Sequence, residues 1–381
     1  MKNDKRAIAA LWFGTVAIIS DIYVAQPILP LLSSSFGVSH TVASLAVSLN
    51  ILALSIALLI YGPISDYVGR KPVMVITGFL LAVPTALIAF TTDFTAFLIL
   101  RTVQGLFVAG IAAIAMAYIT EEFPSAVVGR VMGIYVSSMV AAGFTGRVLS
   151  GVLAGLLNWR ITFIVFSLLN LLGSWMMLRF LPASKKFKRS TGLLNSYSGM
   201  FKHFKNRKLA GAFLIAFMLF FTFTGAFTYI TFYLSAPPFN VSTLFLGLIF
   251  TVYITGVLSP VAGALSSKFG RRPVIGIGLF MAASGILLTR VHSLPVIISG
   301  LLLLCAGLFS TQPAASAFVG DNALVSRGSA TSLYLFSYYI GGSAGAILPG
   351  FLWNTYGWTG VIAVCLAAVV IAFISLFTLC R

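Results

Sequence analysis

The chain has 381 residues, of which 59% are hydrophobic and 8% are charged, and its formal net charge is +17. A soluble globular domain has about 25% charged residues, so this composition excludes an ordinary soluble protein and favours the lipid bilayer as the solvent. The positive charge does not indicate a nucleic-acid partner, because the lysines and arginines lie in short clusters between apolar runs and not along one helix face.

Twelve apolar runs follow one another along the chain, and a helix needs about 20 such residues to cross a bilayer. The first half contains the runs 7–32, 42–61, 73–91, 95–118, 131–157 and 161–181. The second half contains the runs 209–234, 243–265, 274–289, 295–319, 329–354 and 358–380. We predict an all-α integral membrane protein with two pseudo-symmetric six-helix bundles, residues 1–181 and 209–381. A basic linker, residues 182–208, joins them and is expected to include some amphipathic helix on the membrane surface.

Two patterns in the sequence recur after about half its length. Residues 62–73 return as residues 263–274, at an offset of 201 residues, with Ser267 in the place of Asp66. Three glycines of the fifth run return in the eleventh run at an offset of 199, pairing Gly143, Gly146 and Gly151 with Gly342, Gly345 and Gly350. A repeat of this length indicates one membrane unit used twice. Glycines at this spacing let helix backbones approach closely.

The basic residues predict the orientation of the chain. All but four of the 24 lysines and arginines fall on the side of the predicted membrane that holds both chain ends, the exceptions being Arg101, Arg147, Arg160 and Arg290. Lysine and arginine accumulate in cytoplasmic loops. Both termini and the linker are therefore predicted to be cytoplasmic.

The twelve runs, the basic centre and the repeated loop together resemble the major facilitator superfamily. Residues 62–71 match its loop signature between helices two and three, and residues 101–105 (Arg-Thr-Val-Gln-Gly) look like its fourth-helix signature. Residues 23–30 and 146–151 resemble a bacterial branch of efflux permeases of the drug:proton antiporter type. The resemblance implies two halves that rock about a midplane site in a bacterial inner membrane. We expect the protein to function as a monomer.

The first copy of the loop is a candidate conformational latch, formed by Gly62, Asp66, Gly69, Arg70 and Lys71. The glycines are expected to permit tight packing and a turn with positive φ, and the two cations to anchor the loop in the cytosol. The helix macrodipole disfavours an anion at a helix C-terminus by roughly 0.3–1 kcal/mol, so Asp66 needs a compensating partner. The resemblance implies Arg70 and the start of the eleventh helix near residues 326–329. A solvated loop carboxylate is the alternative.

Asp21, Arg101 and Arg147 are charges within the apolar runs. A charge at mid-membrane is costly and is therefore a functional candidate. At 1.5 Å per residue all three lie roughly 20–25 Å from the inner face, so they could meet in one layer. Burial favours a proton-bound carboxyl and a nearby arginine favours the ionised form. The resemblance implies that Arg101 takes part in proton coupling, with Asp21 as our choice of proton carrier. The alternative is a static ion pair between helices one and four.

Arg147 departs from the pattern of the family. Antiporters of this superfamily usually carry Gly-Pro in the matching stretch of helix five, whereas here an arginine follows Gly146. The second buried cation could bind an anionic group of the solute, or it could be satisfied by backbone carbonyls and hydroxyls such as that of Ser150. The sequence leaves both alternatives open.

Polar and aromatic positions within the runs are candidates for the solute path, and packing is the alternative role for most of them. They are Tyr23, Gln26, Asn50, Gln104, Tyr118, Tyr135, Arg147, Asn170, Phe223, Phe227, Gln312, Tyr334 and Tyr338. Aromatic surfaces suit large lipophilic solutes, and Pro27 and Pro30 are expected to kink the first helix. The sequence has no phosphate-cradling motif and no grouping typical of a catalytic or metal site. We therefore expect no enzyme activity and no cofactor, with a proton gradient as the driving force.

The leading hypothesis is proton-coupled export of a small organic or drug-like solute by alternating access. One alternative is uptake or exchange of an organic anion, motivated by Arg101 and Arg147. A second alternative is a non-transporting membrane sensor or scaffold with the same fold. The N-terminal half is expected to manage the coupling, and the aromatic C-terminal half to provide more of the solute contact.

Overall fold

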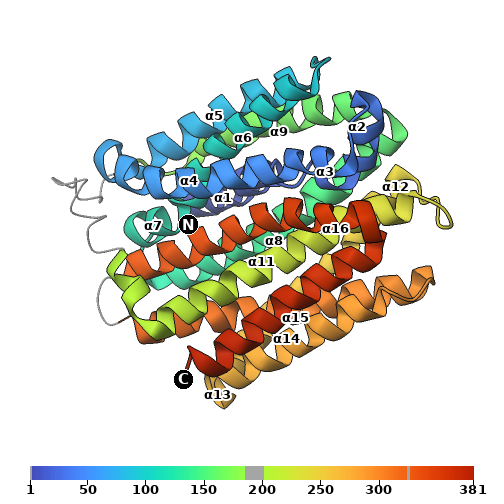
Figure 1. Cartoon of the computed structure of the whole chain (residues 1–381). Coiled ribbons are helices and arrows are strands. Elements are labelled where there is room, and N and C mark those ends of the chain that lie inside the picture. Colours follow the sequence, from blue (N-terminus) through green and yellow to red (C-terminus); the bar gives the residue numbers. More distant parts are fainter. Residues whose placement is uncertain (1, 185–200, 324–326) are drawn as a thin grey trace. The chain divides into compact units, whose positions relative to one another are not determined.

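The structure is a computed structural model that describes residues 2–184, 201–323 and 327–381, and every regular element in these ranges is a helix (Figure 1). The first crossing segment consists of α1 (Lys2–Ser20), the 3₁₀ helix η1 (Gln26–Ile28) and α2 (Leu29–Phe36). The next five are α3 (His40–Ala43) with α4 (Leu45–Val68), α5 (Arg70–Ile88), α6 (Phe94–Ala112) with α7 (Ala115–Glu122), α8 (Ser125–Leu156) and α9 (Trp159–Phe180).

The second half begins with the 3₁₀ helix η2 (Phe201–Lys205). It continues with α11 (Arg207–Ser235), α12 (Thr243–Ile249) with η3 (Phe250–Leu258) and α13 (Ser259–Phe269), α14 (Arg271–Leu288), α15 (Leu294–Asn322) and α16 (Arg327–Thr378). The amphipathic helix expected in the linker falls mostly on residues 185–200, which lie outside the described residues.

Ten helical segments in the described ranges are long and apolar enough to cross a membrane. The first crossing segment is not one of them, because it begins with a charged turn and its helix stops at Ser20. The long α16 is counted once, although it turns sharply at Gly357, whose φ of 56° and ψ of −140° favour glycine. Divided at this turn, α16 supplies the predicted eleventh and twelfth spans. The predicted all-α architecture of twelve spans is therefore confirmed.

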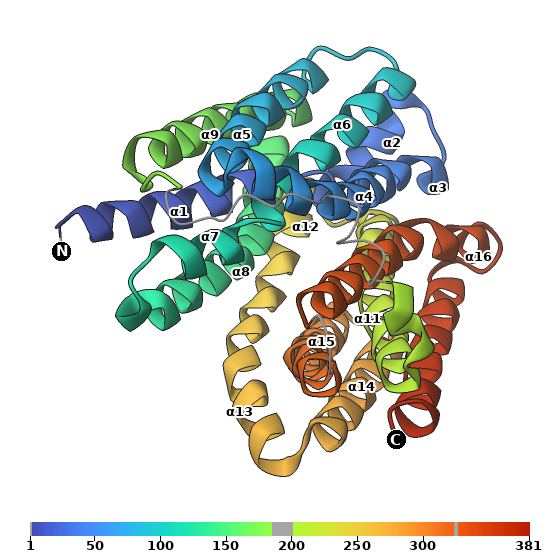
Figure 2. The ribbon, with the colours of Figure 1, turned by 90° about the vertical axis from the view of Figure 1, so that its left-hand side faces the viewer.

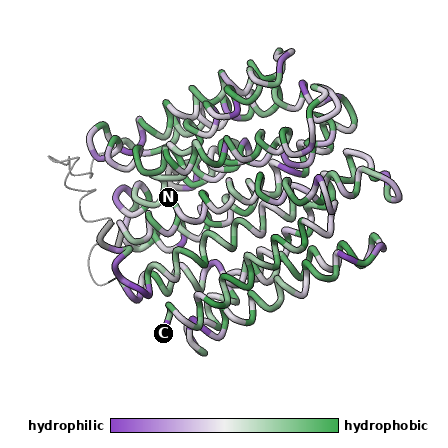
Figure 3. Tube along the Cα trace, viewed as in Figure 1, coloured by the Kyte–Doolittle hydropathy of each residue, from purple (hydrophilic) through white to green (hydrophobic). Residues whose placement is uncertain are grey.

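The contacts of the chain define two compact units. Unit 1 comprises Met1–Val38, Leu49–Leu193 and Ser242–Leu248, and unit 2 comprises Ser39–Ser48, Leu194–Val241 and Ile249–Arg381. These units differ from the predicted halves at two short segments, since the start of the second span groups with unit 2 and the start of the eighth with unit 1. In each unit the most hydrophilic residues gather near helix ends (Figure 3).

In unit 1, α1 packs against α8 and α9, and α5 packs against α6 and α9 (Figure 2). In unit 2, α11 packs along α16 and α15, and α14 packs against α15 and α16. The repeated glycines lie at corresponding contacts. A Cβ on Gly146 of α8 would lie 2.5 Å from the oxygen of Ser20, and one on Gly345 of α16 would lie 2.6 Å from the Cα of Phe221. The predicted close approach of helix backbones is confirmed at both positions.

Large apolar side chains cover much of the outside of both units. Phe90 of unit 1 is 74% exposed, and Phe280 of unit 2 is 67% exposed. A water-soluble surface rarely carries so much exposed apolar area, whereas hydrocarbon chains solvate it. The outer surface therefore agrees with the bilayer inferred from the composition.

Candidate functional site

The first crossing segment is interrupted where it carries its charge. The helix α1 ends at Ser20, and residues 21–25 form turns before η1 begins. Pro27 contributes to this break, because proline has no N–H for the carbonyl four residues earlier and its ring obstructs a regular helix. Carbonyl groups freed within a membrane must find other donors, and here side chains from two other helices supply them.

Arg101 of α6 and Ser150 of α8 donate to this interruption. The Arg101 guanidinium donates to the main-chain oxygens of Asp21 at 2.9 Å and Ile22 at 3.2 Å. The Ser150 hydroxyl donates to the main-chain oxygen of Val24 at 2.5 Å. The interruption of the helix is thus stabilised by side chains that donate hydrogen bonds to its main-chain oxygens.

The Asp21 carboxyl lies in a fully buried pocket of amide side chains. Its Oδ1 accepts a hydrogen bond from Nε2 of Gln104 at 3.2 Å, and its Oδ2 accepts one from Nδ2 of Asn170. Nε2 of Gln104 also donates to the Thr85 hydroxyl at 2.8 Å, while Oε1 of Gln104 accepts from Arg101 at 2.7 Å. Gln104 therefore connects the buried arginine to the buried carboxyl.

This pocket draws on four separate parts of unit 1. Asp21 comes from the interrupted segment, Thr85 from α5, Arg101 and Gln104 from α6, and Asn170 from α9. Thr85 was not among the candidates from sequence, whereas Asn170 was named there as a candidate for the solute path. Thr85 carries no sequence signal, because a threonine in a membrane helix is not costly enough to stand out.

Arg147 of α8 is engaged by the same interrupted segment. Its Nε donates to Oε1 of Gln26 at 2.7 Å, its Nη1 donates to the main-chain oxygen of Gly143 at 2.8 Å, and its Cζ lies 3.8 Å from the ring centre of Tyr23. These contacts favour the alternative in which the protein itself satisfies this cation. Ser150, suggested as a partner, donates to Val24.

Two further path candidates belong to unit 1: Asn50 lies beside the Asp21 pocket, and Tyr135 lies on α8. Nδ2 of Asn50 donates to the main-chain oxygen of Arg101 at 2.8 Å, which ties α4 to α6. Tyr135 of α8 is fully buried, and its hydroxyl has no hydrogen-bond partner among the described residues. A buried hydroxyl without a partner is uncommon, so Tyr135 has hydrogen-bonding capacity left for water or a solute.

The first loop copy is held by a charge network. Arg70 pairs with Asp66 at 2.5 Å and with Glu121 at the end of α7 at 2.9 Å. Gly69 has a φ of 105°, as expected for the turn. The Lys71 ammonium donates to the main-chain oxygen of Leu181 at 2.6 Å, which fastens the loop to the end of α9.

The expectation for Gly62 is wrong in this structure. It lies within α4, and a Cβ there would meet no atom of the described residues within 4 Å. The residue therefore provides neither tight packing nor a positive-φ turn. The partner segment expected near residues 326–329 includes Ser326, which lies outside the described residues.

The second loop copy repeats this network with one substitution. Arg271 pairs with Asp321 near the end of α15 at 3.0 Å, and it donates to the hydroxyls of Ser266 and Ser267 at 2.9 and 3.0 Å. Gly270 has a φ of 92°. The acids Glu121 and Asp321 were not selected from the sequence, although their offset of 200 residues differs by only one from that of the loops.

Unit 2 contains an aromatic hollow between α11, α15 and α16. It is lined by Leu219, Phe223, Leu308, Phe309, Gln312 and Tyr338, and its volume is about 10 Å³. The ring of Tyr338 stacks on Phe220 at 4.2 Å. This volume holds about one water molecule, so an organic solute could enter only if aromatic side chains moved.

The remaining path candidates of unit 2 lie close to this hollow. Phe227 contacts Tyr253 at 4.9 Å between ring centres, and Phe223 contacts the same ring at 5.0 Å. The Tyr334 hydroxyl donates to the main-chain oxygen of Gln312 at 3.2 Å. The structure therefore brings together Phe223, Gln312 and Tyr338, with Phe227 and Tyr334 beside them.

A duplicated helical membrane fold, with a buried charged pocket at an interrupted helix, defines a multi-pass secondary transporter. The chain matches the Major Facilitator Superfamily over residues 11–238 and 235–381, and it belongs to that family. It is therefore a transporter of small molecules and not an enzyme.

Relatives and solved structures agree with this assignment. The chain is 37% identical to the inner membrane transport protein YnfM of Escherichia coli (strain K12), with 97% of this chain and 89% of that protein covered. It is 33% identical to the MFS-type transporter YybF of Bacillus subtilis (strain 168), with 93% and 88% covered. The fold is similar to that of a bacterial homolog of the human lysosomal transporter Spinster, with a TM-score of 0.85 at 15% identity and 99% and 98% covered.

Proposed function

We propose that this transporter exports a small organic or drug-like solute in exchange for protons, by alternating access of its two halves, residues 1–181 and 209–381. The observation that carries the proposal is the buried Asp21 carboxyl at the interruption of the first helix. A buried carboxyl without a function would be costly to keep in a membrane, and this one has partners that suit a change of protonation.

Asn170 is the partner that can serve both protonation states of Asp21. When the carboxyl is ionised, Nδ2 of Asn170 donates to it. When the carboxyl carries a proton on Oδ2, its O–H needs an acceptor. Oδ1 of Asn170 has no other hydrogen bond among the described residues, so the amide can turn over and accept this O–H at no loss of another bond.

Gln104 cannot turn over in the same way. Its Oε1 is held by Arg101, and its Nε2 donates to Thr85, whose own hydroxyl proton is used by the main-chain oxygen of Leu81 at 2.7 Å. Turning the amide would therefore break two bonds. Gln104 and Arg101 form a fixed wall of the pocket that favours the ionised carboxyl, and Asn170 forms its adjustable wall.

The proposed proton cycle follows from these contacts. Water on one side of the membrane delivers a proton to Asp21, and Asn170 turns to accept it. After the halves change their access, the proton leaves to water on the other side and Asn170 turns back. The aromatic side chains around the hollow of unit 2 support a lipophilic solute as cargo, provided that they move to admit it. The loop network of Asp66, Arg70 and Glu121 supports a latch that biases the change of access.

Two rival functions have less support. Exchange of an organic anion drew on Arg101 and Arg147. The Arg101 guanidinium already donates to Gln104 and to the interrupted helix, and Gln26, Gly143 and Tyr23 already engage the Arg147 guanidinium. An anionic group would have to replace these contacts. A non-transporting scaffold would have no use for the adjustable Asp21 pocket. The positive charge near the predicted inner ends supports cytoplasmic termini in a bacterial inner membrane.

Flux measurements in reconstituted vesicles test the proposal. An imposed pH gradient should drive uptake of a solute from a broad panel by the wild type, and Asp21→Asn should abolish this response while solute-for-solute exchange persists. Asp93→Asn is the matched control, because Asp93 caps α6 by accepting from the Ala96 N–H at 2.8 Å and asparagine caps equally well. Flux that ignores both the pH gradient and the membrane potential refutes the coupling, and no flux with any solute favours the scaffold.

A further inference from the structure

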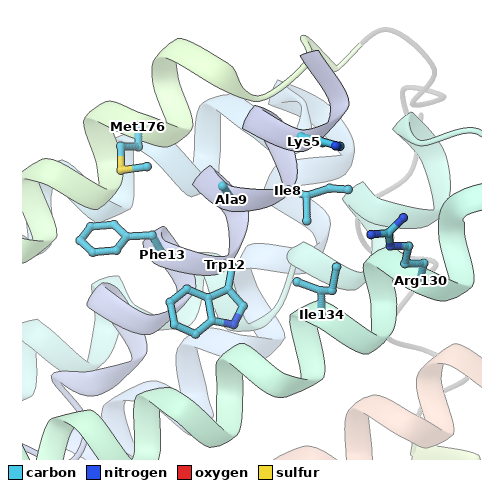
Figure 4. Close-up of a pocket in the computed structure, with 8 residues that line it drawn as sticks. All are labelled: Lys5, Ile8, Ala9, Trp12, Phe13, Arg130, Ile134 and Met176. Atoms are coloured by element: carbon cyan, nitrogen blue, oxygen red, sulfur yellow. The ribbon is translucent and has the colours of Figure 1, made fainter. Parts of the chain in front are cut away.

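A second pocket lies in unit 1, away from the Asp21 site. It is formed between α1, α8 and α9, has a volume of about 470 Å³, and opens to the surface of unit 1 (Figure 4). Its lining includes Lys5, Ile8, Trp12, Arg130, Ile134 and Met176. None of these residues takes part in the proposed transport chemistry, so the pocket calls for another occupant.

The pocket is cationic at one end and apolar at the other. Lys5 and Arg130 lie together at one end, and Phe13 and Met176 lie at the opposite end (Figure 4). No acidic residue is among its lining residues, and neither cation has an ion pair or side-chain hydrogen bond with another described residue. Two adjacent exposed cations without an acid attract an anion.

The apolar end is firmly built. The indole N–H of Trp12 donates to the Ser137 hydroxyl at 3.3 Å, which holds the ring against α8. Trp12 is 37% exposed, and tryptophan favours the boundary between lipid headgroups and hydrocarbon. The pocket therefore combines an anion-binding end with an apolar wall at the depth where lipid headgroups meet acyl chains.

We propose that this pocket binds one anionic phospholipid, with its phosphate between Lys5 and Arg130 and the first part of an acyl chain along Trp12 and Met176. The volume exceeds what a phosphate group alone would fill, and basic pockets between membrane helices recruit anionic headgroups. A lipid bound in this way links the beginning of α1 to the beginning of α8, so it stabilises unit 1. The assignment to the cytoplasmic leaflet rests on the proposed orientation.

The test compares lipid binding to the purified full-length protein and its variants. Phosphatidylglycerol and phosphatidylcholine with the same acyl chains are titrated, and bound lipid is counted by native mass spectrometry alongside the unfolding temperature. Wild type should bind one phosphatidylglycerol preferentially. The double variant Lys5→Gln with Arg130→Gln should bind it about 30-fold more weakly, because each cation near a membrane surface contributes about fivefold to the attraction of an anionic lipid.

The matched control removes the same charge elsewhere. The double variant Lys205→Gln with Arg207→Gln lies outside the pocket, at the start of the second half, and both side chains are exposed. It should bind phosphatidylglycerol like the wild type. An equal loss in the control means that net charge and not the pocket governs binding, and this result overturns the proposal.

A filling variant tests the acyl end separately. Ala9 lines the pocket on the exposed side of α1, so Ala9→Phe fills the hollow and leaves both cations in place. It should also weaken phosphatidylglycerol binding. Binding at wild-type strength in this variant, equal binding of phosphatidylcholine, or full replacement of the lipid by soluble glycerol phosphate at equal concentration each refutes the phospholipid assignment.

Discussion

Replacing Asp21 by asparagine and by leucine separates the pocket's hydrogen bonds from its charge. Both variants are neutral and of similar size, so any cost or gain from removing a buried charge is common to them. In Asp21→Asn, the side-chain oxygen still accepts from Gln104, and the new amide N–H donates to Asn170 once that amide has turned over. Two hydrogen bonds are kept.

In Asp21→Leu, the N–H groups that Gln104 and Asn170 direct at the carboxyl lose their acceptor. The Asn170 N–H is unpaired in both variants, because in Asp21→Asn that amide has turned over, whereas the Gln104 N–H keeps its acceptor only in Asp21→Asn. A buried donor without a partner costs about 1–3 kcal/mol, so the leucine variant should be less stable than the asparagine variant by about that amount. Neither variant can carry a proton at this position. Both should therefore lose the response of solute flux to an imposed pH gradient.

The assay is unfolding of the purified protein, followed by tryptophan fluorescence and compared with flux in vesicles. Trp12, Trp159 and Trp175 report on unit 1, which contains the pocket. A third variant checks the role given to Asn170: the combination of Asp21→Asn with Asn170→Leu should lose the stability that Asp21→Asn alone keeps, as an interaction energy between the two sites. Equal stability of the asparagine and leucine variants, or flux still driven by a pH gradient in either, refutes the reasoning.

Three further predictions concern the helix contact, the loop and the aromatic hollow. Gly146→Ala should destabilise the protein by about 1–3 kcal/mol, because its Cβ would overlap the backbone of Ser20. Gly129→Ala in the same helix meets open space and should be neutral or stabilising. Equal effects of the two variants on thermal unfolding would contradict this packing. Asp66→Asn removes one of the two acids paired with Arg70, so it should shift the inward/outward balance with normal expression, and unchanged labelling of both gates would refute the latch. Tyr338→Phe keeps the stacking at 4.2 Å and should keep solute affinity, whereas Tyr338→Ala should lower it severalfold; equal affinities would remove the hollow from the solute path.

Much of the fold could be predicted because a bilayer allows few solutions. Each crossing segment must satisfy its own backbone hydrogen bonds, so it is a helix of about 20 apolar residues, and such runs are visible without any tertiary information. The glycine repeat also predicted where helix backbones approach closely, because Gly146 and Gly345 lie at equivalent backbone contacts in the two copies. The interruption of the first helix was foreseen only as a kink at Pro27 and Pro30.

The candidate site could be predicted only in part. Asp21 and Arg101 stood out because a charge in hydrocarbon is costly, but that cost does not say which atoms the charges meet. The tight packing expected at Gly62 is not found, because a shared motif does not fix what lies beside each of its residues. Glu121 and Asp321 were missed because an acid near a helix end is common, and only the fold brings them to Arg70 and Arg271.

The sequence by itself determined the bilayer environment, the number of spans, the duplication and the family. Composition, run length and repeat spacing are properties of the chain that can be read residue by residue. Only the tertiary structure decided how the charges are satisfied. Arg101 donates to main-chain oxygens of the interrupted helix and to Oε1 of Gln104, which fixes the orientation of that amide. Oδ1 of Asn170 has no hydrogen-bond partner among the described residues. These assignments depend on the rotation and depth of four packed segments, and hydropathy constrains neither.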